Sequence, residues 1–203
     1  MNGHPLHPLL ARAATEAARL AHGVRPEHLD GPTPCAEFDT RALVNHWVLY
    51  TSHGLEHRAR REPLPPELTE RDFTADPAWA DAYAAQLDRA VAAWADPAVW
   101  EGDVDLGGTA MPATAIARML IKELVVHGWD VARATGQRAE VADDLAATVL
   151  GVVEEYAEIY RQYGGFAAPA ALPADSSLFD RALAASGRDP LWTPAPANAA
   201  PVV

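Results

Sequence analysis

The sequence has a single cysteine, a single lysine and no long apolar run. Cys35 is the only cysteine among the 203 residues, so no disulfide bond within the chain can stabilise the fold. No window approaches 18 uncharged apolar residues, which predicts that no segment spans a membrane. The first ten residues lack the basic flank and apolar core of a signal peptide. These absences together predict a cytoplasmic protein.

Positive charge is also scarce. The chain has 16 basic against 28 acidic side chains and a formal net charge of −12. Nucleic-acid binding requires a basic face to neutralise phosphates, and no basic cluster occurs here. We therefore expect a small molecule, rather than nucleic acid or a membrane, as the binding partner.

Apolar residues recur at spacings of three and four over most of the chain, which indicates amphipathic helices separated by proline and glycine. The predicted helices span residues 5–22, 41–60, 76–95, 112–135 and 141–163, with a short one at 176–186. Residues 99–106 alternate weakly ahead of two glycines, which indicates an extended linker or a short hairpin. The pattern predicts an all-α bundle over residues 1–165 and an Ala/Pro-rich tail over 166–203, disordered from Trp192 onward.

Two titratable residues interrupt the apolar stripe of the helix predicted at 112–135. Glu123 lies at a core-facing position, and His127 follows one turn later on the same face. His46 interrupts the stripe of the helix at 41–60 in the same way. If these helices are neighbours, two imidazoles and one carboxylate converge into a set that binds Zn, Fe, Ni or Co. The alternative is a buried Glu–His hydrogen bond beside a core histidine whose hydrogen bonds are satisfied.

His53 and His57 form a second pair at helical spacing, seven and eleven residues after His46. The polar run around Gly54 indicates the solvated end of a helix, which favours a surface position for both. In the alternative, His53 lines the mouth of a pocket based at His46. Cys35 has no histidine adjacent in sequence, so we interpret it as a buried loop residue rather than a nucleophile.

Three stretches of the chain resemble the DinB-like, mycothiol-dependent maleylpyruvate isomerase N-terminal family. The first is PTPCAEFD at residues 32–39, which leads into RALVNH at 41–46. The second is ELVVHGWDVARATG at 123–136. The third comprises LPAD at 172–175 and AASGRDPLW, which ends at Trp192. The resemblance therefore extends over nearly the whole chain.

This resemblance implies a DinB-like four-helix bundle that holds a divalent metal through His46, Glu123 and His127. Zinc is the usual metal of the family, with nickel, iron or cobalt as alternatives. Characterised relatives use the metal to activate a low-molecular-weight thiol such as mycothiol, for transfer to a small electrophile or for isomerisation of one. The superfamily also implies a homodimer, for which the sequence itself shows no diagnostic seam.

On this basis we expect a metal-dependent thiol transferase or isomerase in which metal-bound water or thiol is the reactive group. Asp130, one turn beyond His127, is a candidate for orienting an imidazole, and His53 is a further catalytic candidate. Tyr50, His53 and Trp129 are expected to line the entry for the thiol and substrate.

Two alternatives stay open at the level of sequence. The first is a non-catalytic bundle that binds a metal or small molecule, and the second is a metal-free bundle with only a structural Glu–His hydrogen bond. The resemblance implies an additional C-terminal domain in the maleylpyruvate enzyme, whereas this chain has a tail of only about forty residues there. We therefore expect a member of the short branch of the family rather than a maleylpyruvate isomerase.

Overall fold

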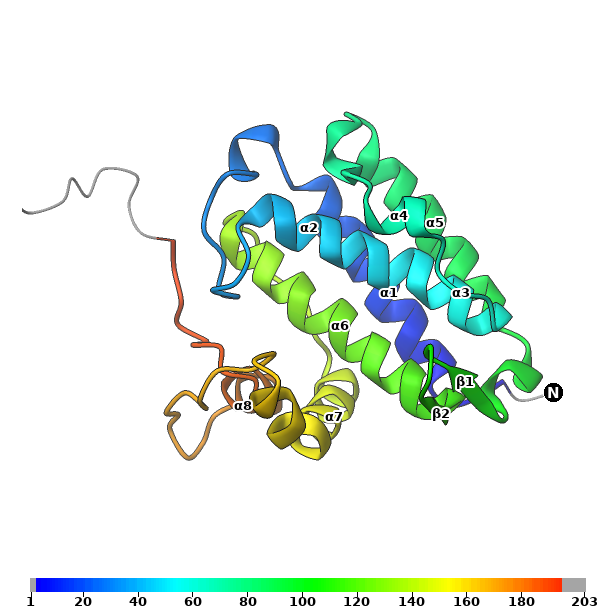
Figure 1. Cartoon of the computed structure of the whole chain (residues 1–203). Coiled ribbons are helices and arrows are strands. Elements are labelled where there is room, and N and C mark those ends of the chain that lie inside the picture. The colour runs from blue at the N-terminus through cyan, green and yellow to red at the C-terminus, as the bar shows by residue number, and fades with distance from the viewer. Residues whose placement is uncertain (1–2, 195–203) are drawn as a thin grey trace, which may run out of the picture.

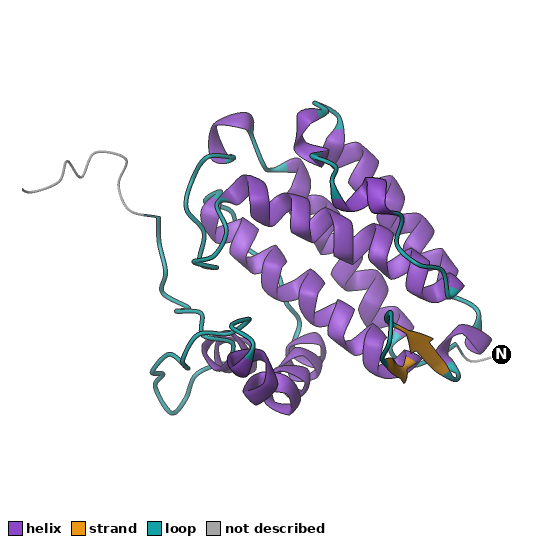
Figure 2. Cartoon of the chain, viewed as in Figure 1, coloured by secondary structure: helices purple, strands orange, loops and turns teal. Residues whose placement is uncertain are grey.

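The computed structural model describes residues 3–194 and is mostly helical (Figure 1). Its helices are α1 (His7–His22), α2 (Thr40–Val48), α3 (Gly54–Arg60), α4 (Pro66–Thr69), α5 (Trp79–Ala93), α6 (Ala113–Ala134), α7 (Asp143–Gln162) and α8 (Leu178–Ala185). Strands β1 (Asp103–Asp105) and β2 (Ala110–Pro112) pair antiparallel as a small hairpin (Figure 2). The predicted all-α fold is confirmed, and the weakly alternating segment 99–106 contains β1, the first strand of the hairpin.

Four helical columns form the bundle: α1, α2 with α3, α5, and α6. In this arrangement α1 packs against α5 and α6, α2 packs against α6, and α3 packs against α5. The inward face of each column carries the apolar stripe, and the fully buried side chains include Leu10, Trp47, Tyr83, Leu124 and Trp94. Because the stripes repeat with the helical period, each column buries one face and leaves the other in water.

The predicted helix at 41–60 is one helical run with a change of register in its middle. Leu49–His53 forms a π-helical segment between α2 and α3. A π-helical segment accommodates extra residues in its turn, so the residues after it rotate about the helix axis relative to an α-helix. Sequence spacing alone therefore assigns the wrong helix face to residues from within this segment onward, His53 included. As a result, His53 and His57 do not continue the stripe of His46.

The polar run at 52–58 is not the solvated end that its composition indicates. Ser52 is fully buried and its hydroxyl donates to the Val48 carbonyl. Glu56 is also buried, where it accepts a hydrogen bond from Gln86 and pairs with Arg60. The surface interpretation was wrong because α5 covers this part of the run and satisfies its polar groups.

The tail packs beside the bundle, where α8 lies against α7 (Figure 1). Phe166 and Ala182 belong to the same buried cluster as the bundle residues. The expected disorder is wrong at Trp192, whose carbonyl accepts a hydrogen bond from Arg133 of α6. The rest of that expectation, residues 195–203, lies outside the described residues. None of the helices between residues 3 and 194 has the length and apolar character needed to cross a bilayer.

Candidate metal centre

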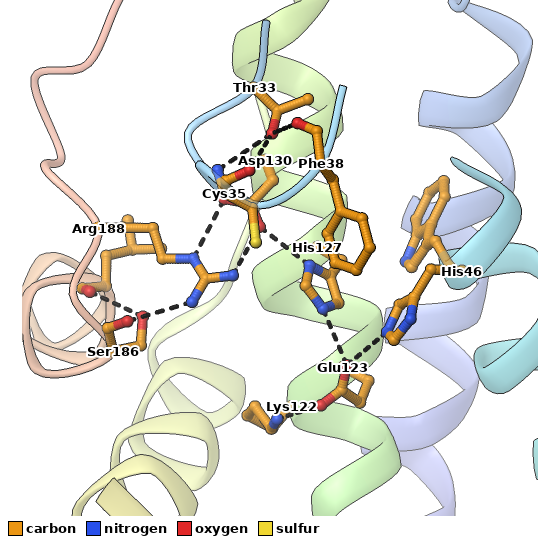
Figure 3. Close-up of polar contacts among 12 residues, drawn as sticks. Thr33, Cys35, Phe38, His46, Lys122, Glu123, His127, Asp130, Ser186 and Arg188 are labelled. Atoms are coloured by element: carbon orange, nitrogen blue, oxygen red, sulfur yellow. Dashed lines mark hydrogen bonds and ion pairs between the residues drawn. The ribbon is translucent and has the colours of Figure 1, made fainter. Parts of the chain in front are cut away.

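His46, Glu123 and His127 converge between α2 and α6 (Figure 3). Nε2 of His127 lies 3.0 Å from Oε2 of Glu123, and Nε2 of His46 lies 3.6 Å from the same oxygen. The two imidazole rings stand nearly perpendicular, with their centroids 5.0 Å apart. Three donor atoms from two helices therefore lie close together, as predicted from the positions of these residues on the apolar stripes of two neighbouring helices.

Packing between α2 and α6 sets this convergence. The indole nitrogen of Trp47 donates to the Leu124 carbonyl at 3.2 Å, which ties the helix that carries His46 to the helix that carries Glu123. Gly128 faces the same indole, and a Cβ there would lie 3.4 Å from it. A small residue at this position lets the two helices approach closely enough for their polar groups to meet.

A buried carboxylate orients the ring of His127. The Nδ1–H of His127 donates to Oδ2 of Asp130 at 3.0 Å, which leaves Nε2 of His127 facing Glu123. Asp130 is fully buried, and Arg188 from the tail donates to it at 2.9 Å. Metal-ligating histidines usually donate their second ring N–H to such a carboxylate, since this fixes the tautomer.

The ionisable groups of the site stabilise one another's charged forms. Burial alone would raise the pKa of Glu123, but Lys122 and His127 outweigh it and hold that pKa well below the usual range. Burial likewise opposes the charge of His127, yet Glu123 and Asp130 raise its pKa. Arg188 and His127 lower the pKa of Asp130 against the same opposing effect of burial. Both carboxylates are therefore ionised at neutral pH.

Lys122 and Arg188 contribute to the site although sequence reasoning did not select them. The ammonium of Lys122 pairs with Oε1 of Glu123 and lies 4.4 Å from the ring centroid of Tyr160. The signals available were that Lys122 is the only lysine, within an apolar stretch, and that Arg188 belongs to the AASGRDPLW motif. Neither signal indicates which residue is contacted, because the contact of Lys122 with Tyr160 depends on the packing of α7 and the contact of Arg188 with Asp130 depends on the packing of the tail.

The donor set suits a divalent metal. One ligand atom from each of His46, Glu123 and His127 lies within 4.8 Å of the others, and two imidazoles with one carboxylate match zinc sites that keep a position open. Cys35, His127 and Asp130 form a second group of the same extent. That group fits less well, because burial raises the pKa of the Cys35 thiol to about 11 and Asp130 already pairs with Arg188.

Two cavities meet at the centre, and they share His46, Glu123 and Tyr160 as lining residues. The first has a volume of about 220 Å³, an apolar lining that includes Met119, and the guanidinium of Arg58. The second, of about 190 Å³, is lined by residues from the loop before α2, from α6 and from the tail: Cys35, Phe38, Lys122, His127, Phe166 and Arg188.

The residues expected at the entrance lie in three different places. Tyr50 lines the first cavity, and its ring lies 4.7 Å from that of His46. His53 lines neither cavity at the centre and lies in a separate one, because the π-helical segment turns it away. Trp129 is buried, lines neither cavity, and lies with its ring 5.9 Å from the Arg133 guanidinium. Arg58, which the sequence analysis did not select, lines the first cavity with Tyr50.

Comparison with known families gives a match over most of the bundle. The model of the mycothiol maleylpyruvate isomerase N-terminal domain family matches residues 10–132. The chain belongs to this family. The matched range includes the three donors and Asp130, and it ends before Arg188. In this member of the mycothiol maleylpyruvate isomerase N-terminal domain family, the buried partner of Asp130 therefore comes from outside the matched domain.

The chain is also similar to two curated proteins and to one solved structure. The chain is 29% identical to the uncharacterized proteins MT0763 and Rv0738 of Mycobacterium tuberculosis over 145 residues, which cover 70% of this chain and 74% of each relative. The crystal structure of a mutant mycothiol-dependent maleylpyruvate isomerase aligns with a TM-score of 0.60 at 16% identity. That alignment covers 93% of this chain and 92% of the other, and it shows a shared fold. The expectation that this chain lacks a whole C-terminal domain of the maleylpyruvate enzyme is therefore wrong for this pair, because 92% of the other chain is aligned.

Proposed function

We propose that this protein is a divalent-metal-dependent enzyme, with zinc as the metal, that activates a mycothiol-like thiol for transfer to a small electrophile or for its isomerisation. The observation that carries the proposal is the approach of two imidazole Nε2 atoms to one carboxylate oxygen where two cavities meet. Family membership supports the thiol. A metal bound here would supply a Lewis acid that favours thiolate over thiol at neutral pH.

The chain's own residues hold the donors in place. Asp130 accepts the Nδ1–H of His127, so the lone pair of Nε2 is directed toward the metal position. Lys122 occupies Oε1 of Glu123, which leaves Oε2 for the side of the two histidines. Holding the ligands in one geometry before the metal arrives reduces the entropy lost on binding.

The two cavities suit two co-substrates that meet at the centre. Arg58 lines the first cavity, forms no ion pair within residues 3–194, and has its pKa lowered by burial. A half-buried guanidinium without a counter-charge favours an anionic group on whichever molecule enters. The apolar lining on the same side accommodates the remainder of that molecule.

Cys35 is unsuited to act as the reactive thiol. It lines the second cavity, but burial raises the pKa of its thiol to about 11, so it is protonated at neutral pH. The nucleophile in this proposal is therefore the thiol of a small molecule. In a transfer, its sulfur adds to an activated carbon–carbon double bond, the neighbouring carbon takes up a proton, and the new C–S bond remains. In an isomerisation, the sulfur adds to such a bond, the former double bond rotates as a single bond, and the sulfur leaves again as thiolate while the double bond re-forms.

Elemental analysis of the purified protein tests the metal centre. We expect stoichiometric zinc or another divalent metal in the wild type, and loss of this metal in His46→Ala. His28→Ala, which removes an imidazole outside the candidate centre, is the matched control and should keep the metal. Substoichiometric metal that His46→Ala leaves unchanged would favour the metal-free bundle instead.

A turnover assay separates the enzyme from a non-catalytic binding protein. The metal-loaded wild type is mixed with mycothiol and a panel of electrophiles, and consumption of each electrophile is followed with and without the protein. We expect metal-dependent consumption or isomerisation of at least one electrophile, abolished in His46→Ala. Stoichiometric metal without turnover of any pair would leave the binding module as the better description.

A further inference from the structure

We propose that a third cavity, separate from the two cavities at the metal centre, is a binding site for a small planar carboxylate. It has a volume of about 140 Å³ and shares no lining residue with the two cavities at His46. Its lining comes from the end of α2, the π-helical segment, residues 71–76 and α5. The lining residues are Val48, His53, Arg71, Phe73, Asp76, Trp79, Ala82, Tyr83, Gln86 and Arg89.

The π-helical segment is the reason that His53 lies in this cavity. Leu49–His53 leaves the α-helical hydrogen-bond pattern and directs His53 toward α5 instead of the metal centre. Such segments are rare and occur frequently at functional sites. Burial lowers the pKa of His53 to about 4, with Arg71, His57 and Arg89 acting in the same direction and Glu56 against it. The ring is therefore neutral at pH 7 and offers one donor and one acceptor.

Positive charge predominates around the cavity, although the chain carries a net charge of −12. Within residues 3–194, neither Arg71 nor Arg89 forms an ion pair with a carboxylate. Asp76 is the one carboxylate in the lining, and it already accepts a hydrogen bond from the Ala78 backbone. The lining therefore has an excess of one positive charge and two guanidinium groups with free donors.

The buried groups beneath the cavity do not compete for these arginines. Glu56 accepts from Gln86 and pairs with Arg60, so its negative charge is compensated. The Gln86 carbonyl oxygen accepts from Arg89, and this contact holds the Arg89 guanidinium at the cavity. Arg89 uses one donor in this contact, and the rest of its fork is available to a ligand.

Aromatic side chains form much of the apolar lining. The ring of Phe73 stacks on that of His53, with 5.4 Å between centroids, and the Arg71 guanidinium lies 5.2 Å from the centroid of the Phe73 ring. Trp79 and Tyr83 also line the cavity, and the Tyr83 hydroxyl is already bonded to Thr51. This lining favours a ligand with an aromatic body, and a carboxylate on that ligand matches the planar fork of guanidinium in two parallel hydrogen bonds.

Calorimetric titration of the full-length protein with benzoate tests the site. Benzamide serves as the neutral analogue of the same shape, and inorganic phosphate as a non-planar anion. We expect benzoate to bind with the higher affinity of the three. Arg71→Gln and Arg89→Gln should each weaken it about tenfold, which corresponds to about 1.4 kcal/mol, because each substitution removes a charge-assisted hydrogen bond to the carboxylate. Both arginines are exposed, so circular dichroism should show unchanged folding in these variants.

Two control variants locate the binding. Arg25→Gln removes the same charge at an exposed position outside this cavity and should leave the affinity for benzoate unchanged. His46→Ala should also leave the affinity for benzoate unchanged, because His46 does not line this cavity. If benzoate bound at the metal centre instead, this variant would lose the binding. The proposal would be overturned if benzoate did not bind, if benzamide bound equally well, or if phosphate bound more tightly. It would also be overturned if only His46→Ala lost the binding of benzoate.

Discussion

Asp130 shows how much one residue of the candidate centre depends on a partner that is distant in sequence. Its carboxylate is fully buried, and its charge is compensated by His127 three residues away and by Arg188, 58 residues further along the chain. Removing one partner of a buried ion pair is costly because the remaining charge stays out of water. The chain therefore relies on its tail to hold the imidazole of His127.

Replacing this tail arginine should destabilise the protein strongly. Arg188→Met leaves Asp130 without its guanidinium partner, and we expect a loss of about 3–5 kcal/mol in the free energy of unfolding. Urea denaturation followed by circular dichroism measures it. Arg12→Gln, which breaks an ion pair about half exposed on both sides, should cost far less, because water screens that pair. Equal effects of the two substitutions would contradict the role assigned to Arg188.

At the scale of elements, the junction after α8 decides where Arg188 can reach. Gly187 has a φ of 82°, a left-handed conformation that residues with a Cβ rarely adopt. A Cβ at this position would also lie 2.7 Å from the backbone nitrogen of Ala167. The tail therefore depends on glycine here both for the turn and for the close approach of two backbone segments.

Gly187→Ala should destabilise the protein by about 2 kcal/mol or more, since the strained φ and the contact with Ala167 add together. Gly54→Ala is the matched control, because Gly54 has a right-handed φ of −58° and its nearest contact would be 3.4 Å. We expect that control to be neutral or to stabilise by up to about 1 kcal/mol. Thermal denaturation compares the two, and a similar midpoint for both variants would refute the expected strain.

At the scale of the whole molecule, metal binding should be visible in stability. A ligand that binds only the folded state at a hundred times its Kd adds about 2.7 kcal/mol. For a chain of this size each kcal/mol corresponds to about 2–4 °C in Tm. We therefore expect zinc to raise the Tm of chelator-treated protein by roughly 5–10 °C. The shift should be absent in His46→Ala, and an equal shift in that variant would point to metal bound elsewhere.

Several features of this protein follow from local sequence. The helix positions follow from apolar spacing together with proline and glycine between the segments, and the placement of Glu123 and His127 on one face follows from their separation of four residues. Periodicity is a property of neighbouring residues, so it can be recognised without knowledge of the fold. The apolar stripe of residues 41–60 singled out His46 as the third candidate donor, the family resemblance implied the same residue, and the structure brings it to the other two.

Only the tertiary structure decided the remaining features. The π-helical segment separated His53 from His46, and a hydrogen-bond pattern of that kind leaves no mark in apolar spacing. The contacts of Lys122 with Tyr160 and of Arg188 with Asp130 join segments distant in sequence. Such contacts depend on which helix faces bury one another. The sequence by itself thus determined the helices and the residues available for chemistry, whereas long-range packing determined which of them share a cavity.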